Sequence, residues 1–269
     1  MGGSTTWTNV TGSYTQGTTD GNGPTLVVTQ TGSASSSSSA KAIKAICAIT
    51  LYGGKTEVNT TKNGAEGLES KTSIDIQGGQ HYFKCYDDCI NSAGKIFFNG
   101  GVTVCYSNGN DAVDSNAGTA GAITIGNGAV LSYSTKGDPE EAFDCDNNNY
   151  IRITGTGIAI GAGGAQSSST GTISGAAQGY SFPGTVSFKA NVYNTIADAS
   201  GNNLATFQLP AAINSKCTFI TATGMVSGQK YNIKSSSTEP TDATTAWHGF
   251  YLGSSHTGTT TVLSSFTAK

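Results

Sequence analysis

Apolar and polar residues alternate in five short stretches of the chain, at 48–54, 73–79, 95–101, 122–128 and 150–157. Alternation with a period of two is typical of a strand with one buried face. Each stretch ends in glycines, which adopt backbone angles that a side chain would forbid. The pattern therefore predicts short strands that end at tight glycine corners, and it contains no helical period.

A short acidic phrase recurs between these stretches, at 66–70, 88–92, 111–115 and 141–145. Each copy holds an oxygen donor, a small residue, an apolar residue and a second oxygen donor. The first donors lie 22, 23 and 30 residues apart, and they are Glu66, Asp88, Asp111 and Glu141. A repeat period in this range indicates a solenoid, and the longer last step predicts an inserted loop around 135–139. The segment 41–45 fits the same template with Lys41 and Lys44 in place of the acids.

A repeat of this length without a helix cannot bury its own apolar face, so successive copies must stack. We expect an all-β protein, a single-stranded right-handed parallel β-helix, whose handedness follows the general chirality of parallel crossovers. One internal ladder should consist of Ile43, Leu68, Ile90, Val113 and Phe143. Because two donors three positions apart would face opposite sides of a straight strand, we expect the acidic phrase at a corner of the coil.

The chain divides by pattern into three consecutive parts of one continuous domain. Residues 1–38 are expected to form an N-terminal strand or cap segment, 39–164 the coils with acidic corners, and 165–269 further strands that extend and cap the β-helix. A solenoid must cover its open end to avoid edge-to-edge growth. The aromatic cluster of Trp247, Phe250 and Tyr251 is better explained by covering the last coil than by binding.

Composition narrows the possible partners. With 12% charged residues and a net charge of −3, the chain has no basic footprint for nucleic acid. No run approaches the ~18 apolar residues that a membrane span needs. The first residues lack a charged and apolar signal segment, so we expect a trimmed mature form. The six cysteines fall in slots of the repeat, which favours small buried thiols over disulfides.

The acidic phrase followed by a Gly-Gly strand corner resembles the calcium-binding carbohydrate-binding β-helix proteins of bacterial cell surfaces, relatives in shape of the pectate lyases. The resemblance is best over 40–164. Beyond it, 199–207 and 225–231 are similar to phrases that follow the coils in that family. The family holds glycine where this chain has Cys89, Ala112 and Ala142. The resemblance implies an extracellular or cell-surface polysaccharide-binding protein for plant-type or acidic, uronate-containing glycans, without an established catalytic role.

Stacked acids repel one another by roughly 1 kcal/mol per pair at 4 Å in water and by more near a protein surface, so a cation is expected between the coils. Calcium takes oxygen ligands from carboxylates, amides and carbonyls, and the phrase lacks the histidines and thiolate donors that favour zinc or copper. More than one Ca²⁺ is expected. The expected ligands are Glu66, Glu69, Asp87, Asp88, Asn91, Asp111, Asp114, Glu140, Glu141 and Asp144. The alternative is a solvated acidic face that pairs with Lys41, Lys44, Lys62 and Lys71.

For sugar binding we expect tyrosines beside the acidic corners to stack on pyranose rings, namely Tyr82, Tyr86, Tyr106 and Tyr133. Core or cap packing explains each of these tyrosines at least as well. A second class of function is a polysaccharide lyase with Arg152, Lys62 or Lys84 as base, and a third is a passive scaffold stiffened by calcium. No catalytic residue is assigned, and His81 and His248 lack the spacing of a triad. A monomer is favoured.

Overall fold

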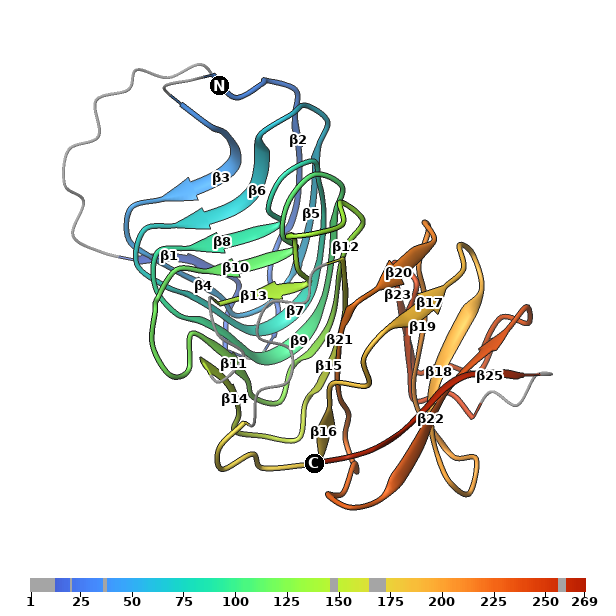
Figure 1. Cartoon of the computed structure of the whole chain (residues 1–269). Coiled ribbons are helices and arrows are strands. Elements are labelled where there is room, and N and C mark those ends of the chain that lie inside the picture. The colour runs from blue at the N-terminus through green and yellow to red at the C-terminus, as the bar shows by residue number, and fades with distance from the viewer. Residues whose placement is uncertain (1–12, 20, 36–37, 146–149, 165–172, 256–259) are drawn as a thin grey trace.

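The computed structural model describes residues 13–19, 21–35, 38–145, 150–164, 173–255 and 260–269. These residues form an all-β protein, a parallel solenoid followed by antiparallel sheets (Figure 1). Nowhere in these ranges is there a helix long and apolar enough to span a membrane. Residues 1–12 and 165–172, which belong to the expected terminal parts, lie outside the described residues.

Three parallel walls make up the solenoid. The first wall contains one short strand per coil: β3 (Ala40–Ala45), β6 (Ala65–Ser70), β8 (Ile90–Ser92), β10 (Val113–Ser115) and β13 (Phe143–Asp144). The second wall contains β1 (Ser13–Gln16), β4 (Ala48–Leu51), the first parts of β7 (Ile74–Cys85) and β9 (Ile96–Ser107), β11 (Ile123–Ile125) and β14 (Ile151–Ile153). The third wall contains β2 (Thr25–Gln30), β5 (Lys55–Thr60), the second parts of β7 and β9, β12 (Ala129–Ser134) and β15 (Ile158–Gly163).

The solenoid and its predicted ladder are confirmed. Strand register places the ladder residues side by side in the first wall, in the order Ile43, Leu68, Ile90, Val113 and Phe143. Four of the five are buried and Ile43 packs against them. The expected glycine corners separate the second wall from the third. A Cβ added to Gly79, whose φ is 89°, would lie 2.6 Å from the carbonyl oxygen of Gly54 in the previous coil, so adjacent coils stack closely only because glycine is present.

The outward face of the third wall changes in character along the solenoid. One cross-strand row consists of Val27, Glu57, Tyr82, Val104, Leu131 and Ile160. Its first members are partly or largely exposed, whereas Val104, Leu131 and Ile160 are buried. Strands β12 and β15 are buried at every position, as in a sheet that is covered on both faces.

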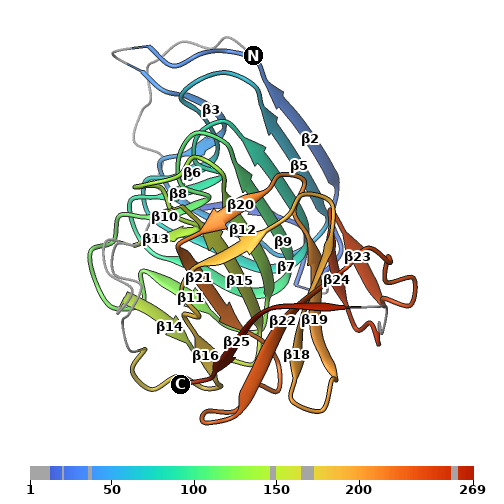
Figure 2. The same ribbon diagram turned by 45° about the vertical axis from the view of Figure 1, so that its right-hand side comes forward.

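A six-stranded antiparallel sheet, which we call the C-terminal sheet, covers this apolar part of the third wall. Its strands in order are β23 (Thr245–Trp247), β24 (Phe250–Leu252), β19 (Asn203–Gln208), β18 (Tyr193–Asp198), β22 (Lys230–Ser236) and β25 (Thr261–Thr267). Ile196 and Phe207 share one buried cluster with Leu131 and Ile160. Figures 1 and 2 show this sheet along the flank of the solenoid, not across its end.

Other strands continue from the last coil of the solenoid. β21 (Cys217–Thr221) pairs antiparallel with β15, and β16 (Tyr180–Ser181) pairs with β21. Phe219 and Tyr180 join the core cluster of the coils. Between β16 and β21 in the sequence, β17 (Val186–Phe188) and β20 (Ile213–Ser215) form a separate two-stranded antiparallel sheet. No disulfide joins the six cysteines, all of which lie in the described ranges, and five of them are buried.

Candidate functional site

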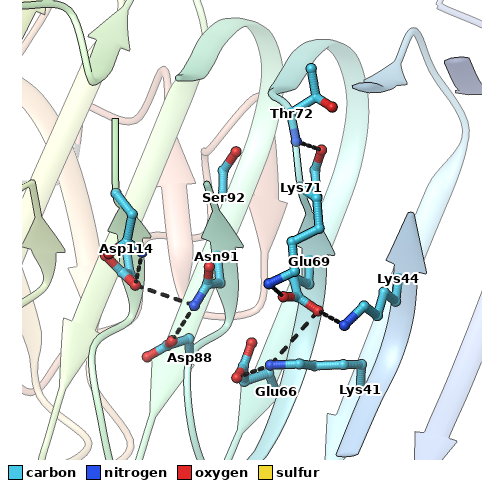
Figure 3. Close-up of polar contacts among 12 residues, drawn as sticks. Lys41, Lys44, Glu66, Glu69, Lys71, Thr72, Asp88, Asn91, Ser92 and Asp114 are labelled. Carbon is cyan, nitrogen blue, oxygen red and sulfur yellow. Dashed lines mark hydrogen bonds and ion pairs between the residues drawn. The ribbon is translucent and has the colours of Figure 1, made fainter. Parts of the chain in front are cut away.

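The acidic phrases form one column on the first wall. Strand register places their second donors next to one another, in the order Glu69, Asn91, Asp114 and Asp144. The first donors are all buried, namely Glu66, Asp88, Asp111 and Glu141. Figure 3 shows carboxylates of successive coils on the same side of this wall.

The expectation that the phrase lies at a corner is wrong for its first copy, which lies wholly inside β6 (Ala65–Ser70). The pairing of β3 with β6 joins Lys41 to Glu66 and Ile43 to Leu68 but has no pair at Gly67. The ladder is therefore interrupted at the small residue of the phrase. Both Glu66 and Glu69 reach the ammonium group of Lys41.

We call the two donors that one coil contributes to the column a rung. Three lysines neutralise the first rung, which consists of Glu66 and Glu69. Lys41 pairs with Glu66, its Nζ also lies 3.8 Å from Oε2 of Glu69, and only 7% of its side chain is exposed. Lys44 Nζ lies 2.9 Å from Oε2 of Glu69, and Lys71 pairs with the other oxygen. Burial pushes the pKa of Glu69 upward, but the bonds from Lys71 and Lys44 and the charge of Lys41 outweigh it and lower the pKa. At this rung the lysine-paired alternative describes the acids.

The next rung has an amide where the first has lysines. Asn91 Nδ2 donates to Oδ2 of Asp88 at 2.8 Å and to Oδ2 of Asp114 at 3.2 Å (Figure 3). The buried Oδ1 of Asp88 has no hydrogen-bond partner among the described residues. Burial, reinforced by the nearby charge of Asp114, raises the pKa of Asp88 to about 8. A carboxylate here is therefore costly unless a cation or a proton accompanies it.

The following coil repeats this situation. Asp111 Oδ1 accepts a hydrogen bond from the backbone N–H of Glu141. Burial nevertheless raises the pKa of Asp111 to about 9, and the charges of Asp144 and Asp88 add to this effect. The remaining expected ligands, Asp87 and Glu140, are only half-buried.

The column is not a preassembled metal centre. Among the described residues, no three side chains of His, Cys, Asp or Glu meet in an arrangement suited to a metal ion. The donors are nevertheless of the type that calcium prefers. Oδ1 of Asp88 is buried and accepts no hydrogen bond among the described residues, so a cation beside it would be stabilising. The amide of Asn91 occupies the position between two carboxylates, and turning it over would present its oxygen instead.

The four expected sugar-binding tyrosines lie on or beside the third wall, but they differ in access. The rings of Tyr106 and Tyr133 stack with centroids 4.6 Å apart. Tyr133 is only 2% exposed, so it offers no free face to a sugar. Tyr86 is 37% exposed. Tyr82 stacks on His248 from the loop between β23 and β24, with centroids 3.7 Å apart and an interplanar angle of 5°.

The residues considered as bases or triad members do not form a catalytic cluster. Arg152 extends outward from the second wall in register with Thr124, and its guanidinium donates to the carbonyl of Ile151. Lys62 is exposed. Lys84 lies on the third wall, with Nζ 5.8 Å from the ring centroid of Tyr106. His81 is buried and its Nε2 contacts the carbonyl of Gly78 at 2.7 Å.

A groove of about 290 Å³ lies on the uncovered part of the third wall, beside Tyr82. Its lining comes from β2, β5 and β7 and consists of Val27, Val28, Thr29, Glu57, Val58, Asn59, Tyr82 and Lys84. Residues 8–112 match a carbohydrate-binding domain family. The description of that family is "Carbohydrate-binding domain-containing protein". Neither a curated protein nor a solved structure matches the chain.

The carbohydrate-binding match covers less than half of the chain. It contains every residue that lines the groove, but it ends before Asp114, Glu140, Glu141 and Asp144 of the acidic column. Glu57 and Asn59 of the groove were not predicted from the sequence, although their outward positions in the alternating stretch 55–60 could have indicated them. Nothing in the sequence indicated that His248 would contact Tyr82.

Proposed function

We propose that this protein binds polysaccharide with the help of calcium, which Asp88, Asp111 and Asp114 hold on the first wall together with the amide oxygen of Asn91. The observation that carries the calcium part is the buried Oδ1 of Asp88, which has no hydrogen-bond partner among the described residues. The carbohydrate part is supported by the match of residues 8–112 to a carbohydrate-binding domain family.

Both adjacent rungs hold a buried carboxylate oxygen without a hydrogen-bond partner among the described residues, on Glu66 and on Asp88, so it is the contrast in lysine pairing between them that supports calcium at this place. The coil that contributes Lys41 and Lys44 supplies its own cations to Glu66 and Glu69. Asp88 and Asp111 occupy, in later coils, the slot that Lys41 fills in its own coil. Burial raises the pKa of Asp88 to about 8 and that of Asp111 to about 9. We infer that lysine ammonium groups replace the ion at the first rung, and that the divalent sites begin at Asp88.

Calcium would also provide the link to the glycan. It accepts six to eight oxygen ligands, so an ion held by a few protein oxygens retains positions for sugar hydroxyls or a uronate carboxylate. A direct contact between a uronate and this acidic column would be repulsive, whereas a bridging cation makes it favourable. Acidic, uronate-containing glycans are therefore the proposed ligands of the column.

We also propose that the protein works outside the cell or at the cell surface. Calcium sites of extracellular modules bind with dissociation constants of about 10⁻⁴ to 10⁻³ M. A column that is not preassembled, and that must lose protons before it binds, fits affinities in that range.

Retention on insoluble polygalacturonate tests this proposal. The wild type should be retained in 1 mM calcium and released by chelator, and Asp88→Asn should lose most of the calcium-dependent part. Asp75→Asn is the matched control, because Asp75 lies on the second wall with both oxygens bonded to the amides of Asn99 and Gln77. Equal retention of the wild type with and without chelator would contradict the proposal.

A further inference from the structure

The third wall has an outward face that the C-terminal sheet covers only in part. Val104, Leu131 and Ile160 lie beneath that sheet. The same row continues into Tyr82, Glu57 and Val27, and Val27 is 66% exposed. The groove of about 290 Å³ occupies this uncovered end. Its volume lies near the lower limit of the roughly 300–1,000 Å³ found for small-ligand sites, a size suited to one or two sugar rings.

The aromatic wall of the groove is held in place before any ligand arrives. His248 covers one face of Tyr82, since rings with centroids 3.7 Å apart leave no space between them. The neighbouring Trp247 donates its Nε1–H to the carbonyl of His81 at 3.1 Å, and Lys55 Nζ lies 5.5 Å from its ring centroid. Tyr82 therefore has little rotamer freedom to lose on binding, which favours affinity.

His248 also holds an unusual backbone conformation. Its φ is 42°, one of two positive values at non-glycine residues among the described residues. Such a conformation is sparsely populated and persists where surrounding contacts stabilise it. Here those contacts are the Tyr82 ring and the edge-on Trp247, whose centroid lies 4.5 Å from that of His248. The C-terminal sheet thus contributes the residue that fixes the aromatic surface of the groove.

We propose that this groove binds a pyranose ring of a neutral glycan chain, and that it does so without calcium. This inference rests on the proposed polysaccharide-binding function but concerns a different wall from the acidic column. Tyr82 supplies an aromatic surface for the apolar C–H face of the ring. Thr29, Asn59 and Lys84 supply a hydroxyl, an amide and an ammonium group for its hydroxyls.

The charges of the groove explain why the ligand need not be acidic. Its lining contains one carboxylate, Glu57, and one ammonium group, Lys84, so their formal charges cancel. His248 Nε2 lies 3.9 Å from Oε2 of Glu57, which orients this carboxylate without removing its capacity to accept hydrogen bonds. The site therefore selects by ring shape and hydroxyl pattern. The whole lining falls within residues 8–112, the part of the chain that matches the carbohydrate-binding family.

Binding to insoluble glucan, xylan and mannan in the presence of chelator tests this proposal. The wild type should bind at least one of these neutral polymers, and Tyr82→Ala should weaken that binding about tenfold, the size expected for loss of one stacked aromatic. Tyr82→Phe should retain most of it. Tyr193→Ala is the matched control, because Tyr193 lies on the C-terminal sheet and packs against Tyr251. Melting curves identify any variant that fails to fold, and Lys84→Ala, at an exposed position, then serves as the second groove variant.

Two results would overturn the proposal. One is a wild type that none of the three neutral polymers retains in chelator. The other is a folded Tyr82→Ala or Lys84→Ala variant with unchanged binding. Retention on polygalacturonate in calcium is measured in parallel with the same variants. If the wild type shows no calcium-dependent retention on polygalacturonate, the function proposed for the column is contradicted. The proposal for the groove is tested only by binding to the neutral polymers in chelator.

Discussion

Replacing Asp88 by asparagine should stabilise the protein in chelator, and most of that gain should disappear in calcium. Asp88 is 3% exposed, and one of its oxygens has no hydrogen-bond partner among the described residues. Without a cation, the folded protein must either bury a carboxylate beside Asp114 or take up a proton. Asparagine preserves the shape and the contact with Asn91 but removes the charge, so the variant avoids this cost.

The magnitude follows from the pKa of Asp88, which burial raises from 3.8 to about 8. At pH 7 the folded group is mostly protonated while the unfolded group is ionised, and this difference spans about 3 pH units at ~1.36 kcal/mol each. The upper limit is therefore about 4 kcal/mol, and relaxation around the site reduces it to about 2–4 kcal/mol. For a chain of this size that corresponds to a rise in Tm of roughly 5–10 °C.

Thermal melting with chelator and with calcium measures both parts of this prediction. Calcium at 100 times its Kd stabilises the wild type by ~2.7 kcal/mol, and the variant should lack most of that gain. Asp75→Asn should melt like the wild type in both conditions. A variant Asp88→Asn that melts below the wild type in chelator would exclude a buried, costly charge at Asp88. An equal advantage with and without calcium would exclude an ion bound there.

Three further predictions concern stability. Lys41→Met should destabilise the protein by about 3 kcal/mol in chelator because it leaves Glu66 buried without its partner, and added calcium should restore part of the Tm. In chelator, the free energy of unfolding should fall as pH rises from about 5 to 9. The raised pKa values of Asp88 and Asp111 make the folded state bind more protons than the unfolded state in that window. A Tm that rises over this range would contradict this prediction. Leu131→Asp should lower the free energy of unfolding by more than about 3 kcal/mol, because it buries a charge between the third wall and the C-terminal sheet. Val226→Asp, at a position that is 55% exposed, should have little effect. Urea denaturation midpoints measure both.

The solenoid could be predicted from the sequence because its two signals are local and repeated. The acidic phrase gave the period, and the alternating stretches gave the strands. The apolar ladder from Ile43 to Phe143 then followed from stacking, and strand register confirms it. The β-helix is thus a fold in which short-range patterns also determine the long-range contacts.

The flank position of the C-terminal sheet was not predicted, although a signal was present. In β12 (Ala129–Ser134) and β15 (Ile158–Gly163) the outward positions include Leu131 and Ile160, where alternation would place polar residues. Strands that are apolar on both sides indicate a sheet covered on both faces. Trp247 was assigned to the last coil, whereas it contacts His81 in the third wall.

The acidic column was predictable as a set of stacked donors but not in its charge state. The sequence places Lys41 and Lys44 one coil before Glu66 and Glu69, yet surface pairs of this kind are usually weak. Their importance arises from burial, since the Glu69 side chain is only 2% exposed, and burial depends on how the coils stack. The contact between Tyr82 and His248 likewise joins residues far apart in sequence, and no local pattern encodes it.

Anomalous diffraction from crystals grown with calcium would locate the ions on the acidic column. We expect an anomalous peak on the first wall bounded by oxygens of Asp88, Asp111 and Asp114, and none at Glu66 and Glu69, where lysines supply the positive charge. Absence of a peak beside Asp88 in crystals saturated with calcium, or a peak confined to the lysine-paired rung, would exclude calcium binding by these aspartates.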